Sequence, residues 1–149
     1  MSNNLIGNIV DWFKAAKPEP TAKDALVQQG CHFEEVVEHL TSIGIENEDL
    51  CGLSNDLKRN TSLQTDDAIA NYVDTIDNLE LLDSLCDQIV TAVGVGYMMG
   101  FDVEGALKEV IRSNNSKMVD GKFIFDENAK IAKPESFSEP NLKPFLGDK

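Results

Sequence analysis

Residues 66–97 read DDAIANYVDTIDNLELLDSLCDQIVTAVGVGY, and they decide the fold class of this chain. Apolar side chains return every three or four residues in this stretch, at Ile69, Val73, Ile76, Leu79, Leu82, Leu85, Ile89 and Val93. This spacing is that of one face of an α-helix. Thr65 predicts the N-terminus, because its hydroxyl can cap free backbone N–H groups and the aspartates after it complement the helix dipole. We expect an interruption near Asp77 and Asn78 and an end at Gly100.

Three further segments carry the same periodicity. The first covers residues 5–13 and is followed by Pro18, which cannot continue a helix. The second covers about residues 24–43, with Gly30 as a point where the helix breaks or kinks. The third runs over about residues 102–113, with an aspartate as its cap. Together these stretches predict an all-α helical bundle.

The remaining segments predict connections and a small β element. Residues 46–64 are polar and rich in turn signals, so we expect a connection with one short helical turn. After Asp120 and Gly121, the runs KFIF and KIA on either side of DENA predict a β-hairpin, and PESFSEPNLKPFL predicts an extended tail. We therefore expect one domain over residues 1–149, with the bundle at about 5–118 and the hairpin and tail at about 119–149.

Composition restricts the class of protein and its partners. The chain has 149 residues, 42% of them hydrophobic, and a net charge of −13, which is typical of soluble globular proteins. Such an acidic surface repels phosphate backbones, so we expect no nucleic-acid partner. The three cysteines form no CxxC pair, and we find no signal peptide and no membrane-spanning stretch. We expect a cytoplasmic protein that does not bind membranes.

Two groups of acidic side chains recur at helical spacing. They are Glu34, Glu35 and Glu38 in FEEVVEHL, and Glu80, Asp83 and Asp87 in ELLDSLCD. Acids this close repel one another, and the repulsion becomes severe where two such faces meet in a bundle. A divalent cation compensates, since Mg²⁺ prefers carboxylate oxygens and keeps positions open for phosphate. The alternative is a solvated acidic face, which is common on a chain of this charge.

A second metal hypothesis uses a different trio. His32, Glu35 and His39 share a helix face at i, i+3 and i+7, and zinc accepts such ligands. However, the chain has no HExxH motif and no Glu-x-x-His pair. The simpler explanation of His32 and His39 is that they lie at the surface or beside another site without binding a metal.

Basic side chains that could hold a polyphosphate follow the last predicted helix. RSNNSKM contributes Arg112, Asn114 and Lys117, and Lys130 and Lys133 follow in the hairpin region. Lysines occur on any protein surface, so these residues indicate a polyphosphate site only if an acidic metal site lies beside them.

These residues carry a resemblance to a known family. EEVVEHL, followed by ELLDSLCDQIVTAVGVGYMMGFDVEGALKEVIRSNNSKM, resembles the MazG-like and phosphoribosyl-ATP pyrophosphohydrolase-like superfamily of all-α nucleotide pyrophosphohydrolases. The resemblance spans about residues 10–146, with residues 46–64 the least similar. The EExxE pattern of the family matches Glu34, Glu35 and Glu38.

The second family pattern, ExxD, fits this chain in two registers. Read literally, ELLD gives Glu80 and Asp83. Aligned on the glycine-containing helix that follows, the family aspartate falls on Asp87 and its glutamate on Ser84, so that Asp83 would replace the glutamate. RSNNSK resembles the RSNMSK of the family, which implies that Asn114 and Lys117 contact phosphate or nucleotide.

The resemblance implies Mg²⁺-dependent hydrolysis of a nucleoside triphosphate, a deoxynucleotide or non-standard nucleotide, to the monophosphate and pyrophosphate. Mn²⁺ would substitute for Mg²⁺, and Glu34 or Glu35 would activate the attacking water. The implied metal ligands are Glu35, Glu38, Glu80, Asp83 and Asp87. The resemblance also implies a homodimer or homotetramer. The alternatives are a phosphoribosyl-ATP pyrophosphohydrolase and a catalytically silent nucleotide-binding module.

Overall fold

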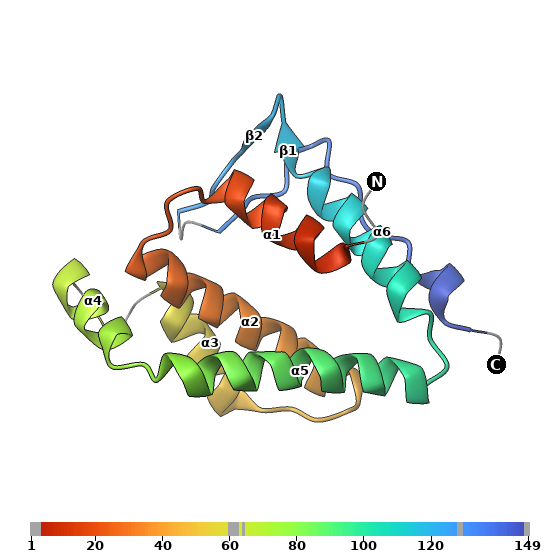
Figure 1. Ribbon diagram of the computed structural model, residues 1–149, viewed down its shortest axis with the longest axis horizontal. Helices are drawn as coiled ribbons and strands as arrows, with labels where there is room; N and C mark the ends of the chain where they lie inside the picture. The colour runs from red at the N-terminus through yellow and green to blue at the C-terminus, as the bar shows by residue number, and fades with distance from the viewer. Residues whose placement is uncertain (1–3, 60–62, 64, 128–129, 148–149) are drawn as a thin grey trace. The chain divides into compact units, whose positions relative to one another are not determined.

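The computed structural model describes residues 4–59, 63, 65–127 and 130–147 (Figure 1). Most of this part of the chain is helical, and its only sheet is a two-stranded antiparallel hairpin, which confirms the predicted all-α fold with a small β-hairpin. The elements are α1 (Leu5–Ala16), α2 (Ala22–Ser42), α3 (Glu48–Arg59), α4 (Asp66–Asp74), α5 (Asn78–Met98), α6 (Val103–Asn115), β1 (Met118–Val119), β2 (Lys122–Phe123) and the 3₁₀ helix η1 (Lys143–Phe145). No described helix has the length and apolar character needed to cross a membrane.

The chain divides into two compact units, each built from segments that are distant in sequence. The first unit comprises Met1–Pro18, Asp77–Ile124 and Ile131–Lys149, and the second comprises Glu19–Ile76 and Phe125–Lys130. Helices α1, α5 and α6 with the hairpin belong to the first unit, and helices α2, α3 and α4 belong to the second.

Helix α2 organises the second unit. Thr21 caps it, with its hydroxyl accepting a hydrogen bond from the Asp24 N–H and the Asp24 carboxylate accepting one from the Thr21 N–H. Leu26 on α2 and Ile69 on α4 are buried, at 1% and 4% exposure. Their burial holds α2 against its two neighbours, because apolar area removed from water stabilises the packed state.

The helix α2 runs unbroken through Gly30, where the sequence suggested a break or kink. A Cβ atom at this position would lie 2.8 Å from the Ser54 carbonyl oxygen and 2.8 Å from the Lys58 backbone nitrogen. The Ser54 hydroxyl donates a buried hydrogen bond of 2.8 Å to the Gly30 carbonyl. Gly30 is therefore a contact point, where the missing side chain lets α3 lie directly against α2 (Figure 1).

The prediction of a connection over residues 46–64 was wrong, because a twelve-residue helix, α3, occupies most of it. Its first turn carries Glu48 and Asp49 and its last turn carries Lys58 and Arg59, so both ends complement the helix dipole. Leu50, Leu53 and Leu57 recur at helical spacing and were the available local signal, but most of the segment is polar. In the structure, α3 packs against α2.

In the first unit, α1 packs on α6. The Trp12 indole N–H donates a hydrogen bond of 3.1 Å to the Asn114 carbonyl, and the Trp12 ring meets Phe123 edge-on at 5.2 Å. At the other end of α6, the Asp102 N–H donates to the Phe145 carbonyl of η1 at 2.9 Å. These contacts join α1 to α6, the hairpin to α1 and the tail to the start of α6.

The hairpin turns at Asp120 and Gly121, which both have positive φ, 49° and 74°. Its register pairs Met118 with Phe123 and Val119 with Lys122. Strand β2 is thus the first half of KFIF, and it pairs with Met118–Val119, which precede that run, instead of with KIA. Those two runs are still joined by backbone hydrogen bonds of 2.8 Å, from Asp126 N–H to the Lys130 carbonyl and from Ala132 N–H to the Ile124 carbonyl.

The interruption expected near Asp77 separates α4 from α5. The Asp77 carboxylate accepts hydrogen bonds of 3.1 Å from the backbone N–H groups of Leu79 and Glu80, and so caps α5. Gly100, with φ of 77°, follows the last turn of α5, as expected.

Candidate functional site

The acidic cluster of α2 contains one carboxylate that binds two lysines. Lys58 Nζ donates to Glu34 Oε1 at 2.9 Å, and Lys130 Nζ donates to Glu34 Oε2 at 2.6 Å. Lys58 reaches across from α3, which the contact at Gly30 brings against α2, and Lys130 comes from the 125–130 segment of the same unit. Both oxygens of Glu34 are therefore engaged.

The hydrogen bonds of Glu34 shift the pKa values of Glu34 and Lys130. Burial opposes ionisation of Glu34, but the hydrogen bonds from Lys130 and Lys58 lower its pKa below the ordinary value. Burial likewise opposes charge on Lys130, and the hydrogen bond to Glu34 raises the pKa of that lysine. Glu34 and Lys130 therefore stay charged at neutral pH. A carboxylate so paired is a poor general base, because proton transfer to it would break two charge-assisted hydrogen bonds.

The other two acids of the EExxE pattern, Glu35 and Glu38, are exposed on α2. They are three residues apart, so one helix face carries both. Carboxylate oxygens are the donors that a hard divalent cation prefers, so this pair fits Mg²⁺ in its chemistry.

The second acidic group, Glu80, Asp83 and Asp87, lies on α5 and is exposed throughout. It belongs to the first unit, whereas Glu35 and Glu38 belong to the second. Asp83 and Asp87 are one turn apart and fit Mg²⁺ by the same donor chemistry. Ser84, which replaces the family glutamate in one register, accepts a hydrogen bond of 3.1 Å from the Gln88 side chain.

Across residues 4–59, 63, 65–127 and 130–147, no three or more His, Cys, Asp or Glu side chains are gathered closely enough to hold a metal ion. His32, Glu35 and His39 are among these residues and form no such group, so the structure adds no support to the zinc hypothesis. His39 is exposed, and the His32 ring tilts against Phe33 at 6.1 Å. The Mg²⁺ ligands stay a prediction, with two carboxylates on α2 and the remainder on α5.

Arg112 holds the tail on α6. Its guanidinium donates to both oxygens of Glu109, at 2.8 and 2.9 Å, to the Ser138 hydroxyl at 3.2 Å and to the Glu139 carbonyl at 3.1 Å. The hydrogen bond from Arg112 and one from the Asn141 N–H lower the pKa of Glu109 to about 2. A phosphate contact by Arg112 would compete with these bonds.

The other predicted substrate contacts of the first unit gather around aromatic rings. Lys117 Nζ lies 5.9 Å from the Trp12 ring centroid and 5.7 Å from that of Phe137, and Lys133 Nζ lies 4.9 Å from the Phe137 centroid. Asn114 joins this cluster through its carbonyl, which accepts from Trp12. Of the five predicted contacts, the structure places these three and Arg112 in the first unit and Lys130 in the second.

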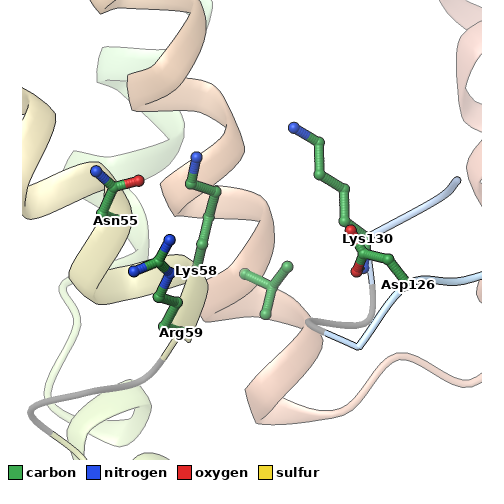
Figure 2. A pocket seen from close by; sticks show the side chains of 6 residues that line it. Asn55, Lys58, Arg59, Asp126 and Lys130 are labelled. Carbon is green, nitrogen blue, oxygen red and sulfur yellow. The ribbon is translucent and has the colours of Figure 1, made fainter.

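A pocket that the sequence did not indicate lies in the second unit beside the Glu34 trio. It has a volume of about 190 Å³ and is lined by Val27, Asn55, Lys58, Arg59, Asp126 and Lys130 (Figure 2). Asn55, Lys58 and Arg59 come from the last two turns of α3, a helix that was not predicted from the sequence. The cations at the end of ENEDLCGLSNDLKR were the available signal, but they point to a pocket only once α3 is placed against α2.

Comparisons with protein-family models, curated proteins and solved structures gave no match to this chain.

Proposed function

We propose that this protein is a Mg²⁺-dependent nucleoside triphosphate pyrophosphohydrolase. Its substrate would be a deoxynucleotide or a non-standard nucleotide, and its products the monophosphate and pyrophosphate. The observation that carries the proposal is the EExxE pattern on α2, with Glu35 and Glu38 exposed on the helix, together with the exposed acids of α5. Both segments resemble those of all-α pyrophosphohydrolases, and this resemblance supports a role for these carboxylates as metal ligands in pyrophosphate release.

Each group of residues has a role in this proposal. The proposed metal ligands are Glu35 and Glu38 on α2, and Asp83 with either Asp87 or Glu80 on α5; a bound cation would offset the charge of the triphosphate and of the leaving pyrophosphate. Water attacks the α-phosphorus, the bond between that phosphorus and the α,β-bridging oxygen breaks, and the water proton passes to a carboxylate. The carboxylate would be Glu34 or Glu35, and Glu34 would have to give up its hydrogen bonds from Lys58 and Lys130 to accept the proton.

The cationic residues of the first unit would contact the nucleotide. Lys117 and Lys133 carry ammonium groups beside aromatic rings, and Asn114 lies at the end of α6 in the same cluster. An ammonium group there offers charge-assisted hydrogen bonds to phosphate oxygens. We expect these residues to affect substrate binding more than metal binding.

Self-association belongs to the same proposal. Leu79, Val90 and Met98 on α5 are 76%, 68% and 82% exposed, and further apolar residues of that helix are exposed as well. Large exposed apolar patches are uncommon on monomers, which supports the homodimer or homotetramer expected from the resemblance.

A second candidate is a catalytically silent nucleotide-binding module. Two observations favour it: Glu34 is tied to two lysines, and Ser84 stands where one register of the family pattern has a glutamate. The chain would then bind a nucleotide without turning it over.

One experiment separates the two candidates. The purified protein is incubated with each ribo- and deoxyribonucleoside triphosphate and with phosphoribosyl-ATP, in Mg²⁺ or in chelator, and the products are separated by chromatography. Release of pyrophosphate and a monophosphate, abolished by chelator, supports the enzyme, and the preferred substrate separates it from a phosphoribosyl-ATP pyrophosphohydrolase. A diphosphate product would overturn the assignment. Binding without turnover would favour the silent module.

A further inference from the structure

The pocket of the second unit concentrates positive charge on a chain whose net charge is −13. Lys58, Arg59 and Lys130 line it, and Asp126 is the one acidic residue among its lining residues (Figure 2). Glu34 accepts a hydrogen bond from each of the two lysines. The three basic side chains thus outnumber the two carboxylates, those of Asp126 and Glu34, by one positive charge. The nearby Cys31 thiol adds no negative charge, because burial raises its pKa.

The hydrogen-bonding capacity of these cations exceeds what Glu34 uses. Each ammonium group has three N–H donors, and the bond to Glu34 takes one from Lys58 and one from Lys130. The guanidinium of Arg59 and the side-chain amide of Asn55 add further donors to the same wall. Lys58 is 16% exposed, so its donors act where water screens them little.

Size narrows the class of ligand. The pocket measures about 190 Å³, whereas pockets for drug-sized molecules occupy roughly 300–1,000 Å³. It therefore suits a phosphate or pyrophosphate group rather than a whole nucleotide. The buried Val27 is the one apolar residue among those that line the pocket, and the other five are polar or charged.

We propose that the pocket formed by Asn55, Lys58, Arg59 and Lys130 is a binding site for inorganic pyrophosphate or for a terminal phosphate group. The anion would be held by the remaining donors of the two lysines and by the guanidinium of Arg59, which recognises phosphate oxygens in a bidentate manner. This site lies wholly within the second unit and does not depend on the proposed hydrolysis.

The test measures binding of inorganic pyrophosphate by isothermal titration calorimetry. The full chain is titrated at constant ionic strength in chelator, so that neither a divalent cation nor turnover contributes. Arg59→Gln and Lys130→Gln are the test variants, because both side chains are exposed enough to change without loss of the fold. Lys23→Gln is the matched control, since it removes the same charge from an exposed residue of α2 in the same unit.

We expect saturable binding that weakens by about tenfold or more in each test variant, the usual effect of losing a charge-assisted hydrogen bond. Lys23→Gln should bind like the unmodified chain within about twofold. Absence of binding would overturn the proposal. An equal loss in all three variants would also overturn it, because net charge alone would then explain the affinity. Failure of hydrolysis with binding intact would count only against the enzyme.

Discussion

Helices α2 and α5 are each 21 residues long, but their surroundings differ. On α2, apolar side chains are buried against α3 and α4, and the carboxylate of Glu34 is paired with lysines from two other segments. On α5, acidic and apolar side chains are exposed together, from Leu79 to Met98. The sequence periodicity is equally clear in both, so periodicity identifies a helix but not what covers it.

The largest expected effect concerns the acids that the two helices contribute. Glu38→Gln on α2 and Asp83→Asn on α5 should each reduce pyrophosphate release by about 100-fold or more, because each removes a proposed metal ligand at constant size. Glu104→Gln on α6, where the carboxylate only pairs with Lys108, should keep its activity.

The same assay decides the register on α5. If Asp83 and Asp87 hold the cation, Asp87→Asn should be inactive and Glu80→Gln should retain activity. The literal ELLD register predicts the reverse. Full activity in both variants would remove α5 from the proposed metal site.

The next prediction tests whether the apolar side chains of α5 are covered in solution. Val90→Asp should convert an oligomer into monomers, because an unpaired carboxylate within an interface costs several kcal/mol. Leu53→Asp makes the same kind of change at an exposed residue of α3 and should leave the oligomer intact. Light scattering coupled to gel filtration gives both masses. A monomeric unmodified chain would refute the expected homodimer or homotetramer.

The contact between α2 and α3 offers a matched pair of glycine substitutions. Gly30→Val should destabilise the second unit by about 1–3 kcal/mol or more, because its side chain would overlap the backbone of α3. Gly52→Ala, on the open side of α3, should stabilise it by about 1 kcal/mol, since alanine favours helix and no atom lies within 4 Å. Urea denaturation measures both. A tolerated Gly30→Val would mean that α3 does not pack at this position.

Gly30 also shows what sequence could and could not predict. A lone glycine in a helical pattern signals a break, and only the presence of α3 turns it into a packing contact. The four strongly periodic segments, which form α1, α2, α4, α5 and α6, were predictable, since their apolar spacing is a local property. Helix α3 was not predicted, because most of its residues are polar, although Leu50, Leu53 and Leu57 recur at helical spacing.

Some residues of the candidate site could likewise be predicted from the sequence, and others could not. The EExxE group could be found from sequence, because its members are adjacent on one helix. The pairing of Glu34 with Lys58 and Lys130 could not, since those residues come from a missed helix and from a segment 96 residues away in sequence. The pocket they line was missed for the same reason.

The smallest effect concerns the ion pairs of Glu34. Its folded-state pKa lies below the ordinary value of 4.5, so its charge stabilises the fold above that pH, and the contribution is lost as pH falls through the folded pKa. Glu34→Gln should therefore cost about 1 kcal/mol at pH 7, and its difference from the unmodified chain should shrink below about pH 4.5. Glu104→Gln, which breaks an exposed pair with Lys108 on α6, should cost no more than about 0.5 kcal/mol at any pH. Thermal melts of the three proteins between pH 3.5 and 7 measure the contrast, at roughly half-unit steps. An equal, pH-independent cost in both variants would show that the lysines of the second unit stabilise the fold no more than an ordinary surface pair does.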